Sequence, residues 1–332
     1  MRITKPSYYD RFHCIAQNCP DSCCKEWEVD IDPETTALYT SLAGKLGEDL
    51  RKHMQINPDG SSCMTIVDGR CPMWQQDGLC RIQASLGHDA LCQTCRDFPR
   101  LIHDYGDFVE YGLELSCPEA ARLILEKSTL VNQDSLSGSA AEYDQEAMAI
   151  LLESRQAALT FLGETALAPD EALAVLLLYG YQVQDALDGG VLTPLDAPAA
   201  LSAAYDHAST GCAQDFQHFF LSLEILNPSW RTRLEMPAEN KPWSGGTFAL
   251  AEYFIQRYWL QAVSDFDLVS RVKFIVSSCL LIHLLGGNFL QTAQQYSKEI
   301  ENSWENVDAL LDAAYTCPAM TDDKLLGLLL NK

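Results

Sequence analysis

Ten of the thirteen cysteines lie between Cys14 and Cys117, in the first third of the 332-residue chain. The remaining 215 residues hold only Cys212, Cys279 and Cys317, each isolated in apolar sequence. Clustered cysteines supply the soft thiolate ligands that zinc and iron–sulfur clusters require. The gradient therefore predicts that the first third folds around a metal centre, and that the rest supplies the scaffold and the substrate surface.

The length of the chain removes the usual reason for a disulfide framework. With 332 residues, 47% of them hydrophobic and 21% charged, the chain can bury a full hydrophobic core. The first twelve residues lack the apolar core and cleavage site of a signal peptide. No run of about 20 apolar residues occurs either. We therefore expect a cytoplasmic protein without a membrane span, and in the cytosol clustered cysteines bind metal or do redox work more often than they form disulfides.

The charge balance bears on the choice of partner. The formal net charge is −23, and residues 1–117 carry 11 basic and 18 acidic side chains, against 12 and 28 in the remainder. Such a field repels a phosphate backbone and an anionic membrane surface, so neither nucleic acid nor membrane is expected as a partner. A basic substrate, such as a lysine side chain, would be attracted, although acidity also serves solubility alone.

Helix signals change in density along the chain. In the first third, Asp32-Pro33-Glu34 predicts a helix start that runs to about 42 or resumes to 54. Asp68-Gly69 and Asp77-Gly78 predict turns or a small hairpin around Cys71. From Pro118 onward, apolar periodicity and cap residues predict helices at 118–127, 146–162, from 169, 197–208, 213–225, 247–263, 267–285, 288–300 and 322–330.

These patterns predict a mainly α fold, in which an irregular cysteine-rich, metal-binding N-terminal module packs on a helical domain. The polar, small-residue stretch 132–140 is the best linker, so the expected domains are 1–130 and 141–332. Asn302, with Glu305 three residues later, predicts one more helix start, and Thr321 is expected to cap the last helix.

The residues alone leave the metal open between zinc and an iron–sulfur cluster, since both need four converging thiolates. Cys92-x2-Cys95 has a spacing that lets two sulfurs meet one ion, whereas adjacent Cys23 and Cys24 would point apart in extended chain. His13 and His88 are further candidate ligands near cysteines. The other cysteines are expected to be structural: Cys63, Cys212, Cys279 and Cys317. The chain contains no Rossmann glycine fingerprint and no Walker loop.

A longer pattern carries a resemblance. Its parts are Arg11-Phe12-x-Cys14-x4-Cys19-x3-Cys23-Cys24-x2-Trp27, Cys71-Pro72, Gly78-Leu79-Cys80, Cys95-x2-Phe98-Pro99-Arg100, Ser116-Cys117-Pro118-Glu119 and the later segment Tyr296-Ser297-Lys298-Glu299-Ile300-Glu301. This pattern resembles the flagellin lysine-N-methylases. Its Cys-Cys and Cys-Arg-x-Phe-Pro portions also occur in a broader group of proteins described as zinc- or iron-chelating.

The resemblance implies an S-adenosylmethionine-dependent protein-lysine N-methyltransferase with flagellin as its substrate. It also implies a [4Fe–4S] cluster, with zinc as the alternative metal. The implied ligands come from a pool of family positions: Cys14, Cys19, Cys23, Cys24, Cys71, Cys80, Cys95 and Cys117.

Lysine methylation needs a neutral amine, so a carboxylate or tyrosine must take up its proton. The candidates for this role are Glu119, Tyr111, Glu26 and Glu299, and Arg100 is a candidate to bind the carboxylate of the methyl donor. The residues leave two other functions open. One is a non-catalytic zinc- or iron-binding module that carries metal or docks on a protein, and the other is a redox or metal-delivery protein that uses Cys23 and Cys24.

Overall fold

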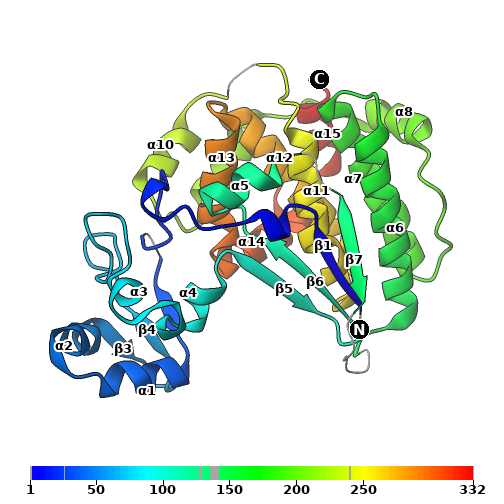
Figure 1. Ribbon diagram of the computed structural model, residues 1–332. Coiled ribbons are helices and arrows are strands. Elements are labelled where there is room, and N and C mark those ends of the chain that lie inside the picture. The colour runs from blue at the N-terminus through cyan, green and yellow to red at the C-terminus, as the bar shows by residue number, and fades with distance from the viewer. Residues whose placement is uncertain (1, 26, 127–128, 135–141, 239–240, 332) are drawn as a thin grey trace.

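The computed structural model describes residues 2–25, 27–126, 129–134, 142–238 and 241–331 (Figure 1). The chain is mainly helical, as expected, and it also contains two small sheets. Two separate hydrophobic cores organise it. A small core lies within residues 29–92, and a large one includes Tyr8, Phe12 and Phe108 together with the helices that follow.

The small core belongs to the cysteine-rich part of the chain, which projects as a lobe in Figure 1. A three-stranded antiparallel sheet with the order β2-β4-β3 supports it. Tyr39 is buried there, and its hydroxyl donates to the carbonyl of Ala90. The elements are β2 (Val29–Ile31), α1 (Pro33–Ser41), α2 (Gly44–His53), β3 (Met54–Ile56), β4 (Ser62–Met64), α3 (Arg81–Leu86) and α4 (Gln93–Asp97).

The second sheet lies against the helical body and has four strands in the order β5-β6-β1-β7. They are β1 (Arg2–Pro6), β5 (Arg100–Asp104), β6 (Phe108–Leu113) and β7 (Leu130–Asp134). β1 and β6 are parallel, with Thr4 opposite Glu110, and both outer pairings are antiparallel. This sheet was not expected. Its parallel pair joins residues 106 positions apart, as in Arg2 opposite Phe108, and such pairing depends on tertiary context.

The helical body surrounds one central helix, α12 (Leu268–Leu285), which packs against α7, α11, α13 and α14. Among the described residues, α12 alone is long and apolar enough to cross a membrane, and 94% of it is buried inside the protein. The body consists of α5 (Pro118–Ile124), α6 (Gln145–Glu164), α7 (Pro169–Leu187), α8 (Ala197–His207), α9 (Ala213–Leu221), α10 (Pro228–Glu235), α11 (Thr247–Tyr258), α12, α13 (Phe289–Tyr296), α14 (Trp304–Thr316) and α15 (Asp322–Leu329).

Start signals read from the sequence place most helices correctly. Proline stands in the first turn of α1, α5, α7 and α8, and aspartate caps α1, α6 and α12 through its side chain. α10 also has proline in its first turn, but no helix was expected at 228–235. The expected turns also form, since Asp68, Gly69 and Gly78 adopt positive φ.

Several expected boundaries were wrong. α5 ends at Ile124 and α9 at Leu221, and α13 gives way to a π-helical turn, Ser297–Glu301. Ser303, not Asn302, caps α14, because its hydroxyl accepts from the N–H of Asn306. Of the expected linker 132–140, the first three residues belong to β7 and the rest lies outside the described residues. The division at 130 and 141 stays a prediction.

Candidate functional site

The cysteines of the first third lie on turns and helix starts. Cys14 and Cys19 flank a short 3-10 turn, Ala16–Asn18, and Cys23 and Cys24 share a tight turn. The indole N–H of Trp27 donates to the carbonyl of Cys23 at 2.9 Å and so holds that turn. All thirteen cysteines carry free thiols.

Three cysteines of the first third occupy the N-cap positions of short helices, which the sequence analysis did not foresee. They are Cys80 before α3, Cys92 before α4 and Cys117 before α5. Burial raises the pKa of Cys117 to about 12, and the N–H groups of Ala120 and Glu119 act in the opposite direction by favouring its thiolate. Helix starts therefore offer partial positive charge to several of the thiols.

Thiols from distant parts of the sequence converge around Cys23. The Cys23 thiol is hydrogen-bonded to that of Cys24, which is the main reason that its pKa is raised. The adjacent side chains therefore do not point apart as the extended-chain argument expected, because a turn replaces the extended backbone. The charge of Cys23 in turn acts on the thiols of Cys19, Cys71, Cys80, Cys95 and Cys117.

Cys92 and Cys95 form a second thiol pair. A hydrogen bond from the Cys95 thiol lowers the pKa of Cys92 to about 7, whereas the same bond raises the pKa of Cys95. In the part of the chain that the structure describes, no three His, Cys, Asp or Glu side chains are placed so that they could hold a metal ion. The thiols are thus near neighbours without forming a ready single-ion site.

The other candidate ligands lie apart from this group. His13 and His88 are exposed. Cys63 is buried in β4, where burial and the nearby Glu28 carboxylate raise its pKa, and Cys279 is buried in α12. Cys212 precedes α9, and Cys317 follows α14.

Two of the candidate proton acceptors are engaged in ion pairs or caps. Glu119 forms a two-pronged ion pair with Arg122, at 2.7 and 2.9 Å, and this pairing lowers the pKa of Glu119. Glu299 is buried, and it accepts from the backbone N–H groups of Leu226 at 2.8 Å and Asn227 at 3.0 Å. The oxygens of both carboxylates are therefore engaged by groups of the fold.

The remaining candidates differ in their surroundings. Tyr111 lies on β6, half-buried, with its ring 5.4 Å from that of Tyr9. Arg100 begins β5 in an exposed position, and its guanidinium lies 5.3 Å from the ring centre of Phe12. Glu26 lies outside the described residues. None of these observations tests a catalytic role, so the assignments stay predictions.

A buried charge cluster was missed by the sequence analysis. The Glu301 carboxylate, on the π-helical turn, accepts from the hydroxyls of Tyr258 at 2.9 Å and Tyr253 at 3.1 Å. Arg257 pairs with the same carboxylate at 3.3 Å and donates to the Tyr253 hydroxyl at 2.7 Å. The i, i+4 spacing of Tyr253 and Arg257 within a predicted helix was the only available signal.

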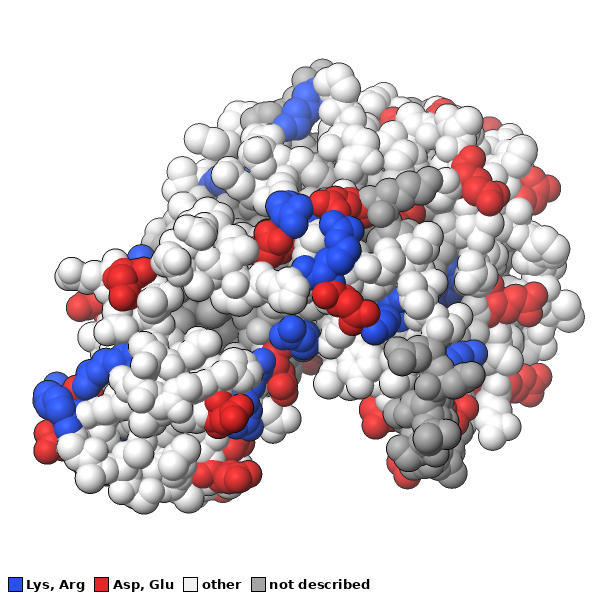
Figure 2. All heavy atoms as spheres, viewed as in Figure 1, with Lys and Arg blue, Asp and Glu red and all other residues white. Residues whose placement is uncertain are grey.

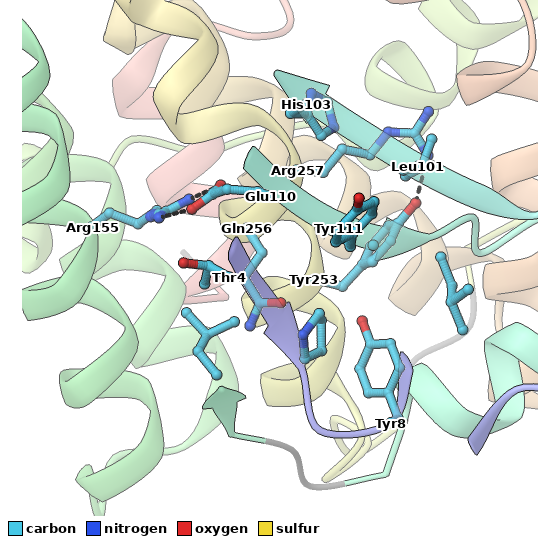
Figure 3. Close-up of a pocket in the computed structure, with 14 residues that line it drawn as sticks. Thr4, Tyr8, Leu101, His103, Glu110, Tyr111, Arg155, Tyr253, Gln256 and Arg257 are labelled. Carbon is cyan, nitrogen blue, oxygen red and sulfur yellow. Dashed lines mark hydrogen bonds and ion pairs between the residues drawn. The ribbon is translucent and has the colours of Figure 1, made fainter. Parts of the chain in front are cut away.

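A small pocket lies between this cluster and the four-stranded sheet (Figure 3). Arg155 of α6 crosses to Glu110 of β6 with two bonds of 2.6 and 2.7 Å, and His103 lies opposite Glu110 in the sheet. Burial, then the charge of Arg257, lowers the pKa of His103, so its imidazole is held neutral. The pocket's volume of about 30 Å³ is enough for one or two waters, and far below that of sites for drug-sized ligands.

The later family-like segment reaches the cysteine loops. Lys298 lies 3.1 Å from the carboxylate of Asp21, which stands between Cys19 and Cys23. Gln294 of α13 donates to the same carboxylate at 3.1 Å and to the carbonyl of Ser116 at 2.7 Å. Two elements near the C-terminus thus contact the Cys19–Cys24 loop, and one of them, α13, also contacts the residue before Cys117.

Acidic and basic side chains are interspersed on the face shown in Figure 2, and a hollow separates the cysteine-rich lobe from the rest of the molecule. A broad hollow of about 1050 Å³ lies elsewhere, at the turn between β5 and β6, where Tyr105, Tyr143 and Phe266 line it. The described residues that line this second hollow include no cysteine and no candidate proton acceptor.

Comparison with known proteins finds similarity to proteins of Salmonella. It is 36% identical over 131 residues to the lysine-N-methylase of Salmonella typhimurium, a match that covers 37% of this chain and 32% of that protein. It is 35% identical over 131 residues to the flagellar biosynthetic protein FliU of Salmonella muenchen, covering 37% of this chain and 76% of FliU. No family model and no solved structure matches the chain.

The match therefore spans about a third of the curated lysine-N-methylases and most of FliU. At this identity and coverage of FliU, and with the cysteine pattern quoted above, the chain belongs to the flagellin lysine-N-methylase family.

Proposed function

We propose that this protein is a protein-lysine N-methyltransferase that moves a methyl group from S-adenosylmethionine to lysine side chains of flagellin in the cytosol. The observation that carries the proposal is the match to proteins named lysine-N-methylase and to one named for flagellar biosynthesis. The net charge of −23 supports a basic group as substrate, since it raises the local concentration of lysine side chains.

We further propose that the cysteine-rich lobe holds a [4Fe–4S] cluster. This part of the proposal is supported by the family cysteine pattern and by the thiols of the first third whose pKa values respond to the charge of Cys23. A cluster takes one thiolate per iron, and a zinc site, with four ligands around one ion, is the alternative. The ligands would come from Cys14, Cys19, Cys23, Cys24, Cys71, Cys80, Cys95 and Cys117.

If one of its irons lacked a cysteine ligand, such a cluster would supply a Lewis-acidic iron for the methionine part of the donor. The chain's own residues must do the rest. The substrate amine attacks only when neutral, so a group near the cysteines must accept its proton. Glu119 and Glu299 suit this role poorly because of their partners, and Tyr111 is left among the described candidates. Arg100, exposed at the start of β5, is kept as the proposed partner of the donor carboxylate.

Mass measurement of flagellin tests the activity. Anaerobically purified protein, S-adenosylmethionine, a reductant and flagellin are incubated together, and the expected result is a flagellin mass gain in steps of one methyl group. The matched control omits S-adenosylmethionine. A flagellin mass that stays unchanged with cluster-loaded protein would overturn the proposed activity.

Metal analysis of the same sample tests the cluster. We expect brown protein with about four iron and four sulfide per chain. A colourless protein with one zinc per chain would replace the cluster with a zinc site, and it would favour a metal-binding interaction module over an enzyme.

A further inference from the structure

Lys298 is a buried cation directed at the cysteine loop. It is 7% exposed, and its ammonium lies 3.1 Å from one oxygen of Asp21. The other oxygen of Asp21 lies 2.6 Å from Lys25. Asp21 is two residues from both Cys19 and Cys23, so any movement of its carboxylate is transmitted to both cysteines through a very short stretch of backbone.

Gln294 extends this contact to a second cysteine-bearing segment. Its amide nitrogen donates to Asp21 and also to the carbonyl of Ser116, which precedes Cys117. One side chain therefore ties together segments that are 95 positions apart and that each carry thiols influenced by Cys23.

The π-helical turn fixes the direction of Lys298. A π turn is rare and is frequently found at functional sites. Here the two glutamates of the turn bind different parts of the body. Glu299 accepts hydrogen bonds from the backbone N–H groups that precede α10. Glu301 accepts from the hydroxyls of Tyr253 and Tyr258 and pairs with Arg257. Because these two carboxylates anchor the turn in the body, Lys298 is held toward Asp21.

The charge of Lys298 also matters for the thiols. Several thiolates gathered in a partly buried lobe repel one another, and a nearby buried cation offsets that repulsion. Lys298 is placed to do this for the Cys19–Cys24 loop, because its partner Asp21 stands two residues from Cys19 and two from Cys23.

We propose that Gln294 and Lys298 are positioning residues that hold the Cys19–Cys24 loop and the Cys117 segment in place, and that Lys298 supplies positive charge to the metal centre. The second half of this statement rests on the proposed iron–sulfur cluster. The positioning role concerns the protein's own loops and does not depend on the cluster.

Lys273 provides a matched control. It is 5% exposed in α12, and its ammonium donates to the carbonyl of Ala314 at 2.6 Å and pairs with Asp322 at 3.0 Å. It is thus a second buried lysine paired with an aspartate, but its partners lie in α14 and α15 rather than beside cysteines.

The experiment compares wild type with Lys298→Met, Lys298→Arg, Gln294→Leu and Lys273→Met. Hydrogen exchange of the reduced, metal-free proteins tests positioning. We expect peptides covering residues 19–24 and 116–117 to exchange at least tenfold faster in Lys298→Met and Gln294→Leu, and to be unchanged in Lys273→Met. Equal rates in all variants would overturn the positioning role, and Gln294→Leu keeps the test valid if Lys298→Met does not fold.

Redox titration of the iron-loaded proteins tests the charge. Loss of a nearby cation favours the more oxidised cluster, so Lys298→Met should shift the reduction equilibrium about tenfold, which is about 59 mV toward negative potential for one electron. Lys298→Arg should keep the wild-type potential, as should Lys273→Met. A wild-type protein that binds no iron would overturn the cluster and with it the charge role, whereas an iron-loaded Lys298→Met with wild-type potential would overturn the charge role alone.

Discussion

Glu299 is a carboxylate whose chemistry suits a catalyst but whose oxygens serve the fold. It is 1% exposed and accepts two backbone N–H groups at the start of α10. We predict that Glu299→Gln lowers the free energy of unfolding by about 1–3 kcal/mol, because the amide presents a donor where an acceptor is needed. Urea denaturation measures this loss, and exposed Glu48→Gln is the control. A variant of wild-type stability that has lost methylation would instead assign Glu299 a catalytic role.

His283 gives the helical body a pH dependence. Its ring stacks on Trp243 at 3.8 Å, and burial, aided by the charge of Lys241, lowers its pKa to about 4. The unfolded chain binds this proton near pH 6.5, so the free energy of unfolding falls as the pH drops from about 6.5 to 4 and is unaffected above that window. We predict that His283→Phe, which keeps an aromatic stack, reduces this fall in metal-free protein. Urea denaturation at pH 7.5 and 5 measures the change in unfolding free energy, and His218→Gln, at an exposed position, is the control. If His283→Phe loses as much unfolding free energy between these pH values as wild type does, His283 is not the group responsible.

At the scale of elements, one ion pair joins the four-stranded sheet to the helices. Arg155 of α6 and Glu110 of β6 are both largely buried, with side chains 6% and 10% exposed. Removing one partner leaves an uncompensated buried charge, so we predict that Arg155→Met costs about 3–5 kcal/mol of unfolding free energy. The double variant Arg155→Met/Glu110→Leu should recover most of that loss. Thermal or urea denaturation of wild type, the single variant and the double variant measures the loss and its recovery. A double variant as unstable as the single one would refute the pairing argument.

Arg122 offers the matched control for that cycle. Its guanidinium also pairs with a carboxylate, that of Glu119, but the Arg122 side chain is 50% exposed. Arg122→Met should cost only about 0–1 kcal/mol, because solvent screens the pair.

Local signals account for the elements that could be predicted. Helices that begin with proline or an aspartate cap, such as α1, α7 and α12, appear where the sequence placed them, since those signals act over one turn. The pairing of β1 with β6 was not readable, because a parallel pair is set by contacts across the fold. The candidate site was likewise readable only in part. The cysteine pattern indicated the cysteine-rich lobe. The contact from Lys298 to Asp21 spans 277 positions, so no local pattern encodes it.

For the whole molecule, the two hydrophobic cores imply unequal local stability. The large core extends from Tyr8 to Leu329, whereas the small core in the cysteine-rich lobe is limited to a few side chains such as Tyr39, Leu50 and Met73. Regions with few buried apolar contacts open at lower free energy than a central helix does. A metal centre bound only by the folded lobe would add its binding free energy to the stability of that lobe.

We therefore predict that chelation of the metal raises amide hydrogen exchange within residues 29–97 and leaves α7 and α12 unchanged. α12 serves as the internal control, because it is almost wholly buried in the body. Mass spectrometry measures the exchange rates of the lobe and of α12 in one sample, before and after chelation under reducing conditions. Equal acceleration in the lobe and in α12 would mean that the two cores unfold as one unit, and no change in either would mean that the metal contributes nothing to the lobe's stability.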